Sequence, residues 1–107
     1  MVFRVAVDSR CQDLTTVEIY LLKENGPFWC YVGGPEPINV GLEQASEVSA
    51  AAFALHDKVR VLLLGYSAAG DCLCMHDGIY PAGAAAYPVD LSYAPSQCTA
   101  PLHSTCR

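Results

Sequence analysis

The chain has 107 residues, of which 52% are hydrophobic and 16% are charged, and this balance predicts one domain with a packed core. The net charge of −5, without any run of Lys and Arg, argues against binding to nucleic acid. No apolar run is long enough for a transmembrane helix, so we expect no membrane span.

The first predicted elements are strands. Met1–Asp8 alternates apolar and polar residues, as a half-buried strand does, and Thr15–Lys23 alternates in the same way. Glu24–Pro27 is typical of a hairpin turn, because Asn and Gly accept positive φ angles at low cost. Phe28–Val32 is then the returning strand. This segment predicts a β-hairpin.

A break and a helix should follow the hairpin. Gly33–Pro37 contains two prolines, which exclude a central strand and indicate that the sheet ends there. Asn39 is a suitable helix cap, and Glu43 lies early in the helix, where the dipole favours a negative charge. The apolar residues recur at helical spacing. This stripe consists of Leu42, Ala45, Val48, Ala52 and Leu55.

The segment Ser49–Tyr66 should form the core of the domain. It begins as the end of the helix, turns at His56–Lys58 and continues as an apolar strand. Val59, Val61 and Leu63 fall on one face of that strand, and Leu62 and Leu64 fall on the other. A strand that is apolar on both faces must be covered on both, and the preceding helix is the expected cover for one face.

The rest of the chain reads as two strands and loops. Cys72–His76 is a short strand, Asp77–Ala84 is a loop, and Ala85–Ala94 is a last strand that Pro88 places at a sheet edge. No periodicity is visible after Pro95. The order of elements predicts an α+β fold that is mostly β, a single domain over residues 1–107 in the form of a small barrel with one helix packed on it.

Six cysteines are a high and even count for a chain of this length. They indicate up to three disulfides in an extracellular domain, and metal binding or burial in a cytosolic one. The first ten residues lack a signal-peptide pattern, so the chain is either cytosolic or a mature secreted domain written from a replacement Met1. We favour the oxidised, secreted interpretation, although the sequence does not give the pairing. The cysteines are Cys11, Cys30, Cys72, Cys74, Cys98 and Cys106.

One local pattern could bind a metal. On a strand, Cys72, Cys74 and His76 would share one face, close enough to hold a soft metal ion. The spacing is not that of the usual zinc pairs, and cysteines that are bridged or buried in the core explain the pattern more simply. Metal is therefore the alternative, and we expect no cofactor. The three histidines show no signature of a catalytic triad, so we expect no enzyme.

The remaining candidate is a binding surface. Aromatic rings with polar tips suit sugar faces or protein interfaces. They are Tyr20, Trp29, Tyr31, Tyr66, Tyr80, Tyr87 and Tyr93. The Tyr80–Gly83 loop and the approach to the second strand are the polar patches best suited to bind a ligand.

Two runs of the sequence resemble the binding (B) subunits of pertussis-type and subtilase-type AB toxins. TTVEIYLLKENGPFWCYV (15–32) resembles their first hairpin, and SAAAFALHDKVRVLLLG (49–65) resembles their helix-into-strand segment. Their chains also often end in a close pair of cysteines, as Cys98 and Cys106 do here.

The resemblance implies an OB-like barrel in a homo- or hetero-pentameric ring. Such a ring binds sialylated glycans on host cells and delivers an enzymatic A subunit. It places the glycan on short polar residues ahead of the first hairpin strand, here Gln12, Asp13, Thr15 and Thr16, with Tyr80 as a loop contact. Two alternatives remain open: a small disulfide-stabilised protein-interaction domain without sugar binding, and a Cys/His metal-binding domain.

Overall fold

The computed structural model describes residues 2–38, 43–45, 53–54, 56–84, 86–100 and 102–106. In these residues the chain forms strands and one short 3₁₀ turn. The elements are β1 (Val2–Val7), η1 (Ser9–Cys11), β2 (Thr16–Asn25), β3 (Phe28–Pro37), β4 (Glu43–Ala45), β5 (Lys58–Tyr66), β6 (Cys72–Pro81), β7 (Tyr87–Tyr93) and β8 (Ser104–Thr105).

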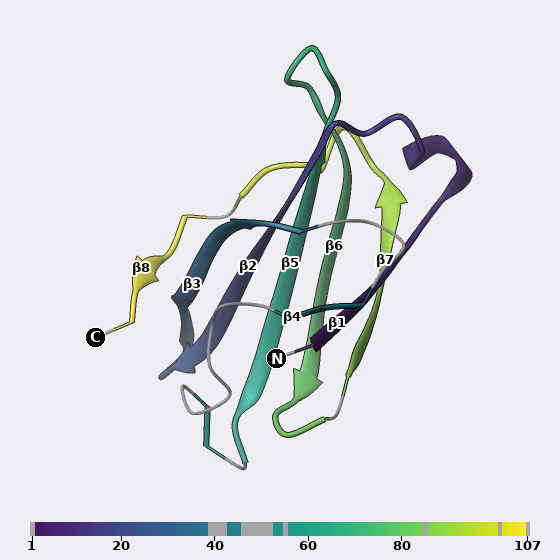
Figure 1. The fold of residues 1–107 in the computed structure, drawn as a ribbon. Coiled ribbons are helices and arrows are strands. Elements are labelled where there is room, and N and C mark those ends of the chain that lie inside the picture. The colour runs from purple at the N-terminus through teal and green to yellow at the C-terminus, as the bar shows by residue number, and fades with distance from the viewer. Residues whose placement is uncertain are drawn as a thin grey trace.

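The strands form one open, mixed sheet in the order β4-β1-β7-β6-β5-β2-β3-β8 (Figure 1). β1 is parallel to β7 and β3 is parallel to β8, whereas the other neighbours are antiparallel. The β2–β3 hairpin confirms the sequence prediction. Its turn contains Gly26 at φ 65°, a conformation that glycine adopts without a Cβ penalty.

The main core lies where the sheet folds over itself. Figure 1 shows β4 lying across β5 and β6, with β1 beside it in front of the lower end of β6. The inner faces of these layers meet in one apolar cluster, in which Phe3 and Tyr87 stack with ring centroids 5.5 Å apart. β5 contributes Val59, Val61 and Leu63 to this cluster, each fully buried. We call the face of the sheet that carries this core the inner face.

A second, smaller apolar cluster lies on the opposite face, which we call the outer face. It consists of Leu22, Leu62 and Leu64, all almost completely buried. Aromatic side chains and the segment around Cys98 and Ala100 pack against it. The prediction that β5 is buried on both faces is therefore confirmed, and among the described residues the cover comes from strands and from the segment around Cys98.

The predicted α+β fold with a packed helix is wrong. In the described residues the chain is mostly β and contains no α-helix. Residues Glu43–Ala45, predicted as helix, form β4 and pair with β1, because backbone pairing with a neighbouring strand outweighs a weak local helix preference. The other stripe residues, Leu42, Val48, Ala52 and Leu55, and the cap Asn39 lie outside the described residues.

The predicted small OB-like barrel is wrong as well. Closure would require the two end strands of the sheet to pair with each other. β4 and β8 instead stand at opposite ends of an open sheet in the described part of the chain. The described residues also contain no helix of the length and hydropathy that crossing a membrane requires.

Gly33–Pro37 does not end the sheet as predicted, because β3 continues to Pro37. β8 pairs only with Cys30 and Tyr31, so the prolines lie where β3 is an edge strand and no partner needs their missing N–H groups. Two register shifts accommodate this part of the β2–β3 pair. A Cβ on Gly34 would lie 2.5 Å from the carbonyl oxygen of Ile19, so the backbones approach too closely for any other residue.

The end of β6 and the place of β7 in the sheet also differ from the prediction. β6 extends to Pro81, through residues predicted as loop, because it pairs with β5 along its whole length. β7 is not an edge strand, since it lies between β1 and β6. It pairs with β6 only at Tyr93 and Ser92, so at Pro88 no second ladder needs an N–H donor.

Candidate functional site

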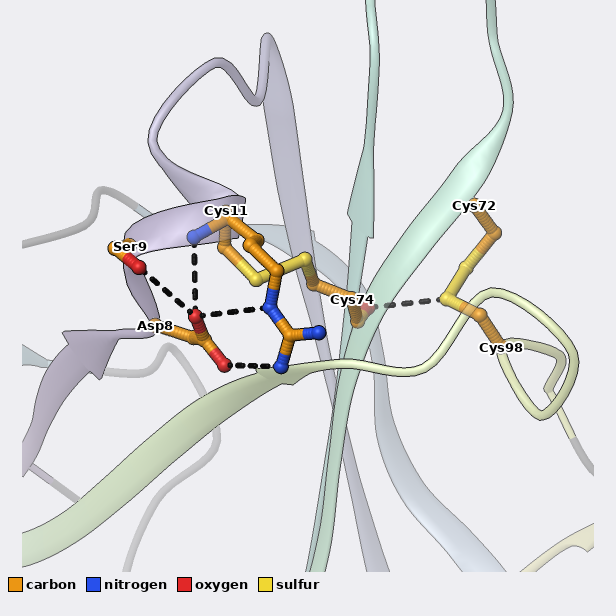
Figure 2. The surroundings of a disulfide bond; sticks show 7 residues. Asp8, Ser9, Cys11, Cys72, Cys74 and Cys98 are labelled. Carbon is orange, nitrogen blue, oxygen red and sulfur yellow. Dashed lines mark hydrogen bonds and ion pairs between the residues drawn. A yellow bond between two sulfur atoms is a disulfide. The ribbon is translucent and has the colours of Figure 1, made fainter.

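All six cysteines form disulfides. The pairs are Cys11–Cys74, Cys30–Cys106 and Cys72–Cys98. η1 positions the first pair: the Asp8 carboxylate accepts a hydrogen bond from the backbone N–H of Arg10 at 3.0 Å and caps the turn in which Cys11 is buried (Figure 2). The three disulfides confirm the oxidised interpretation and are compatible with an extracellular protein.

The alternative metal site does not form. Leu73 is an extra residue in β6, since Gly65 pairs with Cys74 and Tyr66 pairs with Cys72. This β-bulge reverses the alternation of side chains. Cys74 therefore joins the inner core, and Cys72 packs on the outer face, as Figure 2 shows by the opposite directions of the two disulfides. Both sulfurs are bonded, and no cluster of potential metal ligands occurs among the described residues.

The predicted glycan-binding residues lie in two places. Gln12, Asp13, Thr15 and Thr16 are exposed where the chain enters β2. Thr16 pairs with Tyr66 at one end of β5, whereas Tyr80 pairs with Val59 at the other end. The seven positions between Val59 and Tyr66 correspond to about 23 Å along the strand. The fold therefore brings the four polar residues together and leaves Tyr80 apart from them.

Tyr80 belongs to a hydrogen-bonded group between β6 and β7. Its hydroxyl lies 2.8 Å from His76 Nε2 and 3.3 Å from the carbonyl oxygen of Pro88. His76 Nδ1 donates to the carbonyl oxygen of Asp90 at 3.0 Å. Burial raises the pKa of the Tyr80 phenol above its usual value. These side chains connect the two strands where their backbone ladder has ended, so the Tyr80 hydroxyl already has structural partners.

A different group of residues converges on the outer face. We call Trp29, Tyr31, Arg60, Asp77 and His103 the outer-face site. Strand alternation positions the first four, because Tyr31 pairs with Leu22 of β2, and Leu22 pairs in turn with Arg60 of β5. Arg60 also stands beside β6, which supplies Asp77. The site therefore spans four neighbouring strands.

An ion pair and an aromatic ring form the centre of this site. Arg60 Nε donates to Asp77 Oδ1 at 2.8 Å, and Arg60 Nη2 donates to Oδ2 at 2.7 Å, the bidentate geometry that fixes both planes. The pair lowers the pKa of Asp77 below its usual value, mainly through these hydrogen bonds. The guanidinium carbon lies 5.6 Å from the centre of the Trp29 ring, within cation–π range.

Tyr31 and His103 form the side of the site next to β8. The ring centroid of Tyr31 lies 5.5 Å from that of Tyr20 and 5.7 Å from that of His103, and the contact with His103 is T-shaped. Burial raises the pKa of the Tyr31 phenol. His103 is held there by the β8–β3 pairing and the Cys30–Cys106 disulfide. Its Nε2 atom is buried, and no described residue gives it a hydrogen-bond partner. A buried ring nitrogen without a hydrogen-bond partner is uncommon in folded proteins.

A cavity of about 750 Å³ lies on the other side of β3, against β8. Its lining residues are Lys23, Glu24, Asn25, Cys30, Val32, Ser104, Thr105 and Cys106. The charged groups already have partners: Lys23 lies 3.3 Å from Asp57, and Glu24 lies 3.6 Å from Lys58. The cavity therefore lacks the convergent polar and aromatic groups of the outer-face site.

Sequence reasoning found part of the outer-face site. Trp29 and Tyr31 are among the aromatic residues that the sequence suggests for sugar faces, whereas the sequence assigns none of Arg60, Asp77 and His103 to a sugar site. The alternation within β5 could have placed Arg60 beside Leu62 and Leu64. Asp77 was assigned to a loop, and the position of His103 depends on a disulfide that the sequence does not specify.

No family model, curated protein or solved structure matches the chain.

Proposed function

We propose that the protein is a secreted, disulfide-stabilised glycan-binding domain that uses the outer-face site. The observation that carries this proposal is the placement of part-exposed Trp29 and Tyr31 beside the Arg60–Asp77 pair. A pyranose ring presents an apolar C–H face and a rim of hydroxyls. An aromatic ring suits the first, and a bidentate ion pair with unused donors and lone pairs suits the second.

The toxin-like assembly is not part of the proposal. In the resembling family the ring depends on a small barrel and a pore-lining helix, and the sheet described here is open. The open sheet therefore gives no support to a pentamer or to an A subunit, whereas the outer-face site supports glycan binding without them. Of the two alternatives, metal binding has no free thiolate to use, and protein binding without sugar becomes an outcome of the experiments below.

A glycan array followed by fluorescence titration tests the proposal. Trp29 is the only tryptophan in the chain, so its emission reports on the site without a label. We expect a saturable change on addition of each glycan that scores on the array. A glycan that binds without altering the emission would place the binding surface elsewhere, and an array without any hit would contradict sugar binding.

Matched variants distinguish binding at the outer-face site from non-specific binding to exposed aromatic residues. Trp29→Ala and Tyr31→Ala should weaken binding about tenfold or more, measured by calorimetry, because each removes a ring from the contact. Phe28→Ala is the control, since Phe28 is 71% exposed and comes directly before Trp29 in β3, so that its side chain lies on the opposite face. Equal losses in Trp29→Ala and Phe28→Ala would contradict the assignment. Binding of a protein partner with no sugar affinity would support the interaction-domain alternative.

The proposed export is tested on the native protein. A thiol count by non-reducing mass spectrometry on protein recovered from its own cells should find no free thiol. Six free thiols in that material would contradict secretion.

A further inference from the structure

We propose that the outer-face site selects neutral sugars, recognised through two neighbouring hydroxyl groups, and disfavours sugars that carry a carboxylate. This inference rests on the proposed glycan-binding function and names the class of sugar. It differs from the sialylated glycans that the sequence resemblance implies.

The first step is the charge balance of the face. Arg60 is bonded to Asp77 through two hydrogen bonds, and Lys58 lies 3.6 Å from Glu24. Both β5 cations next to the outer-face site thus stand beside a carboxylate. Glu18 lies on the same face of β2, near Tyr20 and Tyr66, and the whole chain carries a net charge of −5. An incoming carboxylate therefore meets acidic groups at this site, and the two β5 cations there, Lys58 and Arg60, are already paired.

The second step concerns His103, the other group of the site that can carry a positive charge. Its Nε2 atom is buried, and its ring makes a T-shaped contact with the ring of Tyr31 at an interplanar angle of 71°. His103 is part-exposed, but a carboxylate cannot reach its buried Nε2 atom without displacing the segment that holds it, which is fixed by the Cys30–Cys106 disulfide. To bind Arg60, a ligand carboxylate would then have to replace Asp77 in its ion pair. The unpaired Asp77 carboxylate would remain next to the ligand carboxylate and repel it.

The third step is what the ion pair offers to a neutral ligand. Arg60 uses two of its five N–H donors on Asp77, so three remain. Asp77 keeps unused lone pairs, and the Arg60 hydrogen bonds hold its pKa low, so it stays an acceptor at neutral pH. Of two neighbouring sugar hydroxyls, one accepts from Arg60 and the other donates to Asp77. Both hydrogen bonds form without breaking the ion pair or adding charge to the site.

Matched glycan pairs provide the experiment. Each pair consists of a sialylated oligosaccharide and the same compound after sialidase treatment, and both are titrated against the wild-type protein by calorimetry. We expect the neutral member to bind at least about tenfold more tightly, and the difference to shrink when the ionic strength is raised. Equal or tighter binding of the sialylated member would overturn the inference and leave the glycan-binding function standing. If neither member of any pair binds, the proposed function itself fails.

Asp77→Asn tests the role of the ion pair. The variant keeps the shape of the side chain but leaves the Arg60 charge unmatched, so the neutral glycan should lose about tenfold in affinity while the sialylated one gains. Asp90→Asn is the control, because it removes an exposed carboxylate on β7 and should leave both affinities within about twofold. If Asp77→Asn changes neither affinity, the inference is wrong. The wild-type comparison decides the question even where this variant folds poorly.

Discussion

Cys72 and Cys74 lie two positions apart on one strand, yet their side chains emerge on opposite faces of the sheet. The extra residue Leu73 causes the reversal, since β6 uses three residues where β5 uses two. Cys74 then reaches Cys11 in the inner core, and Cys72 reaches Cys98 on the outer face. The two disulfides thereby fasten η1 to one side of β6 and the C-terminal segment to the other.

Deletion of Leu73 should leave all three disulfides in place. The deletion makes Cys72 and Cys74 neighbours in a regular strand, where alternation keeps one cysteine on each face, opposite Tyr66 and Gly65. We expect no free thiol by non-reducing mass spectrometry. Two free thiols in the variant would contradict the assignment of Leu73 as the extra residue of the bulge.

Gly34→Ala should destabilise the protein strongly. The new Cβ would lie 2.5 Å from the Ile19 carbonyl oxygen and 2.8 Å from the Tyr20 Cα, and the residue has φ 111°. Gly70→Ala is a matched control, because Gly70 has φ 86° but nothing within 4 Å of its Cβ position. In urea denaturation we expect about 1 kcal/mol of lost stability at Gly70 and roughly 3 kcal/mol or more at Gly34. Equal losses would show that the close backbone approach contributes nothing.

Tyr80→Phe should cost about 1–2 kcal/mol of folding free energy, because His76 Nε2 then loses its partner between β6 and β7. Tyr93→Phe is the control, since Tyr93 is 38% exposed and its hydroxyl can remain hydrated. The difference between the two variants, measured by thermal and urea unfolding, isolates the part-buried Tyr80–His76 hydrogen bond. A Tyr80→Phe protein as stable as the wild type would contradict the role assigned to this group.

The Arg60–Asp77 pair should contribute a pH-dependent part of the stability. The pKa of Asp77 is lower in the folded chain than its ordinary value, so the folded state binds this proton less tightly than the unfolded state. The contribution is therefore present above about pH 4 and disappears as the pH falls through the lowered pKa. Asp77→Asn should be less stable than the wild type by about 1 kcal/mol at pH 7, a small value because both side chains are part-exposed.

Urea titrations at a series of pH values check this expectation. The wild-type and Asp77→Asn curves should converge below about pH 4, where Asp77 becomes protonated. A difference that stays constant from neutral to acidic pH would mean that the ion pair does not contribute. Asp90→Asn supplies the comparison for an exposed carboxylate that forms no ion pair within the described residues.

Sequence patterns alone determined the elements that depend on residues close together in the chain. The Asn25–Gly26 turn and the alternation of apolar residues specified the β2–β3 hairpin, and the two apolar faces of Val59–Leu64 required a central strand. The count of cysteines indicated disulfides. These features depend on backbone preferences and on side chains close in the chain, which a sequence displays directly.

Only the tertiary structure decided the features that depend on residues far apart in the chain. β4 forms because it pairs with β1. Pro88 is tolerated inside the sheet because the β6–β7 ladder does not extend to it. The bulge at Leu73 places Cys72 and Cys74 on opposite faces. The outer-face site has the same origin: Trp29, Arg60, Asp77 and His103 come from four separate segments and meet through strand register and the Cys30–Cys106 disulfide. Register between distant strands is set by the packing of the whole sheet, so no local pattern contains it.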